Sequence, residues 1–246
     1  MPASPRNASL TVGVLGGMGP DATVDFMAKV LAATPAGSDQ DHVHMLIDHN
    51  PHVPDRTCAI LGKGSEAGAV LAQMAKQLQH AGSDFIVMPC NTAHAFQRDI
   101  EAVLDVPFVS IIDETVAACV AFRAVGLLAT KGCLASGIYD TALSAAGVHA
   151  VMPDDAETTA FMELTASIKA GDSGPDVGTK MLQLANALVS RGAQAVIAGC
   201  TEIPLVLDQS MLDVPLVSST DILAEATVAY ALGQKDLNHK RQGSMT

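Results

Sequence analysis

The chain has 246 residues, of which 49% are hydrophobic and 16% charged, and its net charge is −12. The apolar fraction excludes a disordered chain, and no apolar run approaches the ~18 residues that a membrane-spanning helix needs. An acidic surface repels phosphate groups, so nucleic acid and anionic membranes are poor candidate partners. Because residues 1–10 lack the apolar stretch of a signal peptide, we expect a cytoplasmic protein.

Short β-branched segments alternate with amphipathic segments along the chain. The first half predicts strands at residues 11–17, 43–48, 84–88 and 106–112, and helices at 21–33, 65–80 and 95–104. The second half predicts strands at residues 124–128, 148–152, 193–197 and 214–217, and helices at 138–146, 157–169, 177–190 and 221–232. This alternation is typical of an α/β protein whose parallel sheets are covered by helices on both faces.

An internal repeat relates the two halves. The segment FIVMPCNT corresponds to AVIAGCTE, which aligns Cys90 with Cys200, and VPFVSIIDE corresponds to VPLVSSTDI at a nearly equal offset. The repeat predicts two pseudo-symmetric domains, each a parallel sheet flanked by helices, with the active site in the cleft between them. We expect residues 1–115, completed by a C-terminal helix at about 218–233, to form the first domain. Residues 116–217 form the second, and residues 234–246 a flexible tail.

Cys90 and Cys200 occupy equivalent places, each just past the carboxyl end of a predicted strand, where open α/β sheets bind ligands. Two thiols that face each other across a cleft suit the inversion of a carbon centre. One thiolate takes a proton from one face and the opposite thiol returns a proton to the other. The ordinary pKa of cysteine is ~8.5, close enough to neutral pH for one thiolate and one thiol to coexist in the same site. The polar residues that follow the two cysteines are Asn91, Thr92, Thr201 and Glu202.

The sequence resembles the PLP-independent aspartate/glutamate racemase superfamily, and it is most similar to the aspartate racemase branch. The motifs that carry this resemblance are LGGMGP, HNP, PDRT, PCNTAH, GLLAT, SGIYD and GCTEIPL, which span nearly the whole chain. The resemblance implies a racemase that interconverts L- and D-aspartate, with Cys90 and Cys200 as the acid/base pair, no cofactor or metal, and a homodimeric state. It implies that Arg56 and Lys169 hold the carboxylates of the substrate. The full set of substrate-binding residues that it implies is Met18, Arg56, Asn91, Thr92, Thr130, Lys169, Thr201 and Glu202.

Two features bear on the substrate. The sequence pattern of the glutamate racemases of cell-wall synthesis has an Asp-Ser pair and a His at the positions where this chain has residues 17–19 (GMG) and Glu202. This difference favours aspartate over glutamate as the substrate. Cys133 stands where relatives usually carry Thr, and a thiol is the poorer hydrogen-bond donor. A broad-specificity aspartate/glutamate racemase therefore stays open. So do a related isomerase of the hydantoin racemase or maleate isomerase type and, from another class, a non-enzymatic dicarboxylate-binding protein.

Other signals are weaker. The five cysteines include no CxxC pair, which argues against a disulfide framework and a zinc ribbon. The glycine-rich segment GVLGGMG does not meet the G-x-G-x-x-G spacing of a dinucleotide loop. His94 lies one helical turn after Cys90, where it either tunes the thiol or only packs. The group His42, His44, His49 and His52 lacks the further ligand that would complete a metal site.

Overall fold

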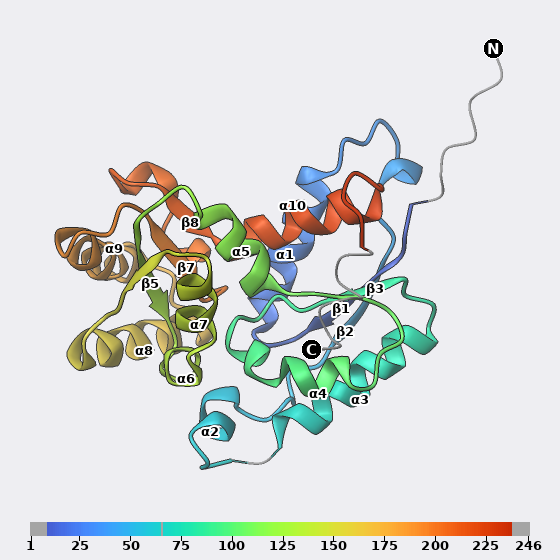
Figure 1. Ribbon diagram of the computed structural model, residues 1–246, viewed down its shortest axis with the longest axis horizontal. Coiled ribbons are helices and arrows are strands. Elements are labelled where there is room, and N and C mark those ends of the chain that lie inside the picture. Colours follow the sequence, from blue (N-terminus) through green and yellow to red (C-terminus); the bar gives the residue numbers. More distant parts are fainter. Residues whose placement is uncertain (1–8, 65, 238–246) are drawn as a thin grey trace.

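The computed structural model describes residues 9–64 and 66–237, which form two lobes that lie side by side (Figure 1). Each lobe contains a four-stranded parallel sheet, and the strand orders β2-β1-β3-β4 and β6-β5-β7-β8 are equivalent. The α/β fold with two parallel sheets is therefore confirmed. The strands are β1 (Val12–Gly16), β2 (Met45–His49), β3 (Phe85–Val87), β4 (Phe108–Val109), β5 (Ala124–Ala129), β6 (His149–Val151), β7 (Val196–Gly199) and β8 (Leu216–Ser218).

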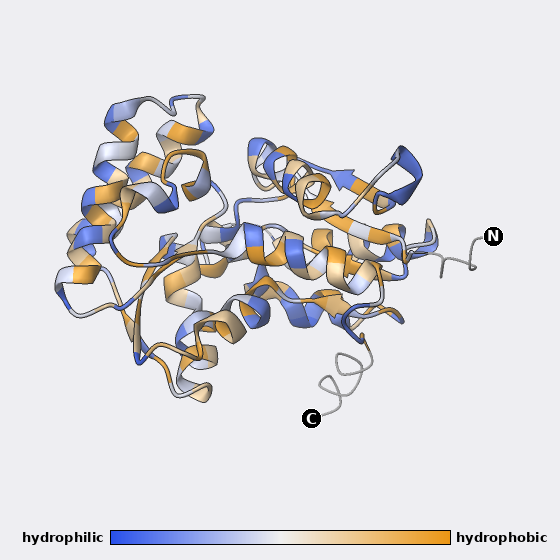
Figure 2. Cartoon of the chain, turned by 90° about the horizontal axis from the view of Figure 1, so that it is seen from above, coloured by the Kyte–Doolittle hydropathy of each residue, from blue (hydrophilic) through white to orange (hydrophobic). Residues whose placement is uncertain are grey.

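Helices cover both faces of each sheet. In the first lobe α3 packs on strands β1 to β3, and in the second α8 and α9 pack on β5. Figure 2 shows hydrophobic and hydrophilic residues mixed along most helices, as expected for helices with one buried face. The helices of the two lobes are α1 (Pro20–Ala33), α2 (Arg56–Ile60), α3 (Ala67–His80), α4 (Gln97–Glu101), α6 (Lys131–Ser136), α7 (Ile138–Ala145), α8 (Asp155–Lys169) and α9 (Pro175–Ser190). Short 3₁₀ turns lie at Asp39–Asp41, Thr92–Phe96, Ile203–Leu205 and Gln209–Met211.

The last helix of each half crosses to the other lobe. Helix α5 (Ile111–Cys119) follows β4 but packs on α7 and β8, while α10 (Ser219–Ala231) follows β8 and packs on α1. The two helices begin alike, because Ser110 Oγ accepts from the N–H of Asp113 and Ser218 Oγ from that of Asp221, both at 3.3 Å. They also pack against each other. The two halves are thus repeats in structure as well as in sequence.

The central core belongs to both lobes. One cluster of buried side chains includes Val14 and Phe26 from the first lobe, Leu127 and Tyr139 from the second, and Leu223 from α10. The outer core of the first lobe lies under α3, and that of the second under α8 and α9. The domain boundaries at residues 115 and 217 stay a prediction. Of the predicted tail, residues 238–246 lie outside the described residues.

Some predicted elements differ from the observed ones. The predicted strand at 106–112 is wrong in its second half, because Ser110 caps α5 and ends the extended segment. The predicted strand at 193–197 is displaced toward the carboxyl end, where β7 runs from Val196 to Gly199. Helices α2, α5 and α6 were not predicted, and of these the short helices α2 and α6 begin right after loops at the carboxyl ends of strands. They bring residues of the candidate site into place.

Candidate active site

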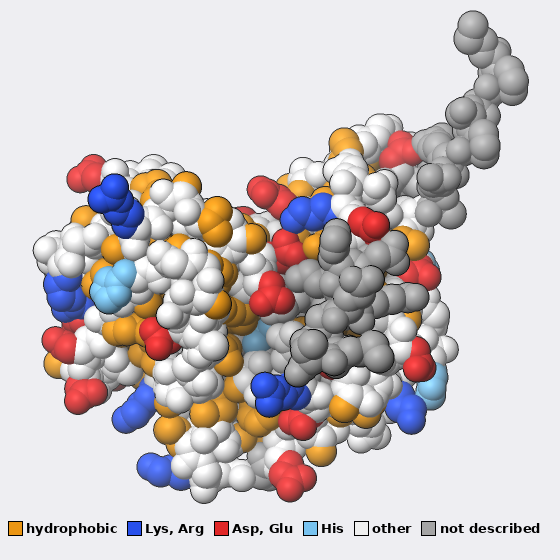
Figure 3. All heavy atoms as spheres, in the orientation of Figure 1, with side chains coloured by type: hydrophobic (Ala, Val, Ile, Leu, Met, Phe, Trp, Pro, Cys, Tyr) orange, Lys and Arg blue, Asp and Glu red, His pale blue; other side chains and the backbone are white. Residues whose placement is uncertain are grey.

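A cavity of about 190 Å³ lies between the lobes at the carboxyl ends of the strands. Loops after β1, β2 and β3 line it from the first lobe, and loops after β5 and β7, with α8, line it from the second. On the face seen in Figure 3, hydrophobic side chains gather where the lobes meet, whereas charged side chains are scattered over both lobes. All ten residues named from the sequence line this cavity: Met18, Arg56, Cys90, Asn91, Thr92, Thr130, Lys169, Cys200, Thr201 and Glu202.

The two thiols lie on opposite lobes and are both nearly buried. Cys90 is 6% exposed and Cys200 is 5% exposed, and both line the cavity. Burial raises the pKa of the Cys90 thiol, and the positive charge of Arg56 opposes this rise. Burial and then the negative charge of Glu202 raise the pKa of Cys200 well above its usual value. The two cysteines therefore have equivalent positions but different electrostatic surroundings.

Glu202 contacts both Cys200 and a cation. The Cys200 thiol donates to Glu202 Oε2 over 2.9 Å, and Lys169 Nζ lies 3.5 Å from Glu202 Oε1. Burial alone would lower the pKa of Lys169, but the negative groups around it, Glu202 first, hold it above its usual value. A Cβ at Gly19 would lie only 2.9 Å from Glu202 Oε1. The glycine-rich loop after β1 thus allows the carboxylate of the second lobe to approach the first.

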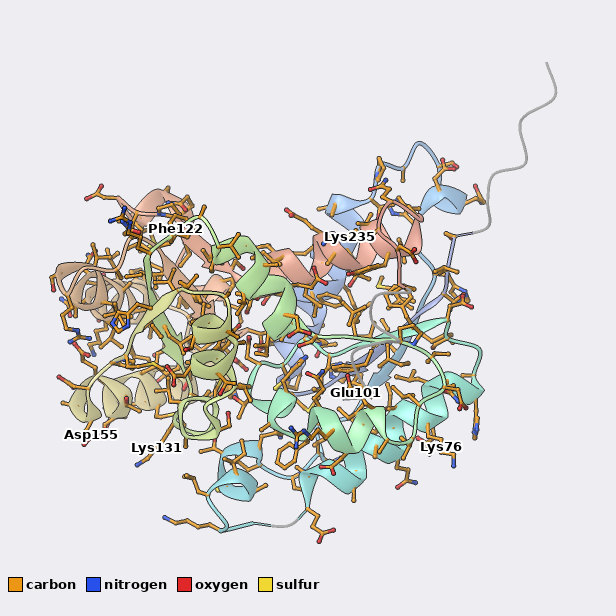
Figure 4. All side chains as sticks on the ribbon, in the orientation of Figure 1. Lys76, Glu101, Phe122, Lys131, Asp155 and Lys235 are labelled. Carbon is orange, nitrogen blue, oxygen red and sulfur yellow. The ribbon has the colours of Figure 1, made fainter. Side chains whose placement is uncertain are left out.

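Among the residues that the structure describes, Arg56 and Lys169 are the two cations that line the cavity. Arg56 is the first residue of α2, and its Nη1 donates to the carbonyl oxygens of Val53 and Pro54 over 2.9 and 3.1 Å. These bonds fix one edge of the guanidinium, which has further N–H groups to offer. Lys131, which follows the cavity residue Thr130, instead points outward from the molecule (Figure 4). Two positive charges therefore stand at the cavity, beside the carboxylates of Asp55 and Glu202, in a protein that is acidic overall.

Two hydroxyls join the lobes inside the cavity. Thr92 Oγ1 lies 2.7 Å from Thr130 Oγ1, and the Thr130 hydroxyl also accepts from the backbone N–H of Cys133 over 3.2 Å. The Cys133 thiol itself does not line the cavity, and burial raises its pKa to about 12. The thiol at this position therefore has no contact with the cavity, and the residue contributes through its backbone.

His94 holds the backbone of the cysteine loop. The N–H of Ile111 donates to His94 Nε2 over 3.1 Å, so that Nδ1 carries the hydrogen and donates to the Cys90 carbonyl oxygen over 2.9 Å. His94 is buried and does not line the cavity. Of the two sequence interpretations, the observed contacts fit packing and anchoring, because the ring contacts the carbonyl of Cys90 and the start of α5.

One wall of the cavity was not predicted from the sequence. Met162, Thr165 and Ala166 line it together with Lys169, and their i, i+3, i+4, i+7 spacing places them on one face of α8. The spacing was readable in the predicted helix at 157–169. No pattern there distinguishes a face that lines a cavity from a face that packs in a core. Asp55 and Thr57, which flank Arg56, also line the cavity.

A second compartment of about 450 Å³ adjoins the first. It shares Arg56, Lys169 and Glu202 with the thiol cavity and continues along Pro51 and Leu205. The three charged side chains therefore stand between a small compartment that holds both thiols and a larger one beyond them.

Within residues 9–64 and 66–237, no group of three or more His, Cys, Asp or Glu side chains is arranged to hold a metal ion. His42, His44, His49 and His52 thus form no such site there. Nor does this part of the chain contain a helix long and apolar enough to cross a bilayer.

Comparisons with known proteins agree on one family. The family model described as Asp/Glu/hydantoin racemase matches residues 15–227. The broad specificity amino-acid racemase RacX of Bacillus subtilis is 31% identical over 229 residues, which cover 90% of this chain and 98% of RacX. Among solved structures, the aspartate racemase of Picrophilus torridus has a TM-score of 0.82 and 30% identity, covering 91% of this chain and 94% of that one. A putative Asp/Glu racemase from Yersinia pestis has a TM-score of 0.78 and 26% identity, covering 91% and 99%.

Proposed function

The chain belongs to the Asp/Glu/hydantoin racemase family, and from this premise we propose that it interconverts L- and D-aspartate by proton transfer between Cα and two cysteines, without a cofactor. The observation that carries the proposal is that Cys90 and Cys200, from opposite lobes, line one small cavity. A substrate Cα between them has one sulfur on each face. The proposal includes the homodimeric state that the sequence resemblance implies.

The two directions of the reaction use the thiols in exchanged roles. In one direction the Cys90 thiolate takes the α-proton and the Cys200 thiol delivers its proton to the opposite face. The other direction begins from the Cys200 thiolate, which forms when the Cys200 thiol passes its proton to Glu202, with which it already shares a 2.9 Å hydrogen bond, and Glu202 releases that proton to solvent. The thiolate so formed takes the α-proton, and the Cys90 thiol delivers a proton to the other face. The pKa rise is opposed by Arg56 at Cys90 and reinforced by Glu202 at Cys200, so Cys90 is the more readily ionised thiol.

The charges around the cavity support a dicarboxylic substrate. Arg56 and Lys169 offer two positive groups to two carboxylates, and a guanidinium binds a carboxylate in bidentate fashion. The same cations stabilise the negative charge that develops at Cα as the proton leaves. Asn91 and the hydroxyls of Thr92, Thr130 and Thr201 supply further polar groups to the substrate, and Met18, in the loop after β1, lines the cavity with an apolar side chain.

The proposal is tested by incubating the protein with L-aspartate in D₂O, without pyridoxal phosphate. We expect D-aspartate to form and to carry deuterium at Cα. Cys90→Ala and Cys200→Ala should each abolish racemisation, while exchange of the α-proton with solvent on one face survives. Absence of both D-aspartate and deuterium in the wild-type reaction would refute the proposal. Dicarboxylate binding that ignores both substitutions, without turnover, would instead favour a binding protein.

A second candidate function is broad-specificity racemisation. It is favoured by the compartment of about 450 Å³ that continues beyond Arg56, Lys169 and Glu202, since a longer side chain has room to extend there. RacX, whose name states broad specificity, is similar over nearly its whole length. A panel of aspartate, glutamate and amino acids with longer neutral or basic side chains separates the two candidates. A kcat/KM for any longer substrate that equals that for aspartate favours the second.

A further inference from the structure

Three buried hydrogen bonds form a continuous chain beside the thiol cavity. The Tyr139 hydroxyl donates to Asn91 Oδ1 over 2.7 Å, Asn91 Nδ2 donates to Ser219 Oγ over 2.9 Å, and Ser219 Oγ donates to the Ala198 carbonyl over 2.7 Å. Tyr139, Asn91 and Ser219 are 1%, 2% and 0% exposed. Only Asn91 lines the cavity. This chain of hydrogen bonds runs from α7 through the loop after β3 to the start of α10 and ends on β7, so it passes between the lobes.

The direction of each bond follows from the last acceptor. A carbonyl oxygen only accepts, so the single hydroxyl hydrogen of Ser219 is committed to Ala198. Ser219 must therefore accept from the amide nitrogen of Asn91, which turns Oδ1 of that amide toward Tyr139. Burial raises the pKa of Tyr139 well above its usual value, so that its hydroxyl keeps the hydrogen that it donates. One orientation of the Asn91 amide satisfies every partner.

This chain connects the two cysteine loops. Asn91 directly follows Cys90, and Ala198 precedes Cys200 by two residues in the same segment. The two sheets share no strand, so the positions of the two sulfurs relative to each other depend on contacts between the lobes. The chain supplies such a contact within two residues of each cysteine. The second hydrogen of Asn91 Nδ2 is not used by these bonds, so this N–H is held in a fixed orientation and can donate to a ligand.

We propose that Tyr139 and Ser219 are positioning residues that, through Asn91, hold Cys90 in register with Cys200 across the cavity. The inference rests on the proposed two-thiol reaction, in which a carbanion formed by one thiol must meet the other thiol on its opposite face. A loop that shifts lets the first thiol return a proton before the second delivers one. The carbanion is then reprotonated more often by the first thiol, which regenerates the substrate, and less often by the second thiol, which gives the product. Substrate binding is affected less.

The variants are Tyr139→Phe, which removes the first of the three hydrogen bonds, and Ser219→Ala, which removes the other two, and each loses no volume beyond an oxygen atom. Tyr230→Phe is the matched control. Tyr230 is the other of the two tyrosines in the chain, is 6% exposed, and its hydroxyl donates to Glu114 over 2.8 Å, away from both cysteine loops. Melting temperatures of the three variants show how much stability each lost hydrogen bond costs.

Two measurements decide the inference. In the first, each protein reacts with iodoacetamide, and mass spectrometry gives the alkylation rate of Cys90 relative to the exposed Cys58. We expect a several-fold change at Cys90 in both variants and none in the control. In the second, initial turnover of L-aspartate in D₂O gives kcat, KM and the deuterium content of recovered substrate and of product. A misplacement of about 1 Å costs up to ~10²-fold in rate, so we expect a fall in kcat of about 10- to 100-fold with KM within about twofold.

The deuterium measurement separates positioning from simple destabilisation. A loss of folded protein lowers the rate but leaves the ratio of deuterium in recovered substrate to deuterium in product unchanged. Loss of register raises this ratio in Tyr139→Phe and Ser219→Ala only. If Cys90 in both variants is alkylated at the wild-type rate, the inference is overturned. It is overturned equally if the ratio of deuterium in recovered substrate to deuterium in product stays at its wild-type value. If the wild-type protein does not turn over aspartate, the proposed function fails, and the alkylation rates still decide whether the hydrogen-bond chain holds the Cys90 loop.

Discussion

Replacing Glu202 by Gln tests the asymmetry of the two thiols. The Cys200 thiol donates to Glu202 Oε2 over 2.9 Å, and this carboxylate is 4% exposed. A hydrogen bond to a charged group contributes about 1.5–3 kcal/mol, and each 1.36 kcal/mol is tenfold in rate, so we expect kcat/KM to fall by about 10- to 150-fold. The amide has the same shape but accepts no proton, while loss of the negative charge lowers the pKa of Cys200.

The assay exploits the symmetry of the reaction. Because the equilibrium constant between two mirror-image substrates is unity, kcat/KM must fall by the same factor from L- and from D-aspartate, whereas kcat alone is free to differ. Initial rates by chiral chromatography from each enantiomer give both quantities, and ultraviolet titration of thiolate gives the pKa of Cys200. Glu163→Gln, on the exposed face of α8, makes the same change of charge away from the cavity and should be neutral. Wild-type kcat/KM in Glu202→Gln would refute the assignment of Glu202 as the proton acceptor of Cys200.

Three further predictions follow from the same geometry. Arg56→Lys replaces a bidentate fork by a single ammonium, so KM for aspartate should rise about tenfold, equivalent to ~1.4 kcal/mol, with a smaller effect on alanine; equal effects on both substrates would contradict it. In Gly132→Ala the new Cβ meets Thr57 Oγ1 at 2.7 Å, and overpacking between α2 and α6 should cost about 1–3 kcal/mol in urea unfolding; an unchanged midpoint would show that the two helices separate freely. Burial raises the pKa of both Cys90 and Cys200 above the usual value for cysteine, so kcat/KM should rise from neutral into alkaline pH as thiolate forms; a plateau reached by pH 7 would show that one thiol is ionised in the free enzyme.

The site was more predictable from sequence than the packing around it. Cys90 and Cys200 follow equivalent strands, and the carboxyl ends of parallel strands meet at one edge of each sheet, so the repeat alone places both thiols at ligand-binding edges. The cations needed the family motifs, because a loop arginine and a lysine at a helix end are ordinary surface residues. Arg56 lines the cavity as the first residue of the short helix α2, which was not predicted.

From the sequence we expect a C-terminal helix at about 218–233 to complete the first domain, but the hydrophobic pattern does not predict that α5 crosses to the second lobe. An amphipathic segment shows that one face is buried but not which lobe buries it. A local signal did exist for the start of α5, since Ser110 and Asp113 have the same spacing as Ser218 and Asp221, and Ser-x-x-Asp is a capping pattern. The β-branched residues that follow Ser110 satisfied the strand pattern as well, and the cap decides between the two.

The crossed helices also set an order of events during biosynthesis. The first lobe is translated first, yet its hydrophobic interior lacks a wall until α10 arrives at the end of the chain, where Tyr230 packs against Phe85 at a ring distance of 6.3 Å and Lys29 pairs with Asp221 at 2.9 Å. A ribosome-bound nascent chain that stops before residue 219 therefore exposes apolar surface on α1 that the finished protein covers. Premature termination before α10 should yield aggregates or protease substrates in place of a shorter enzyme.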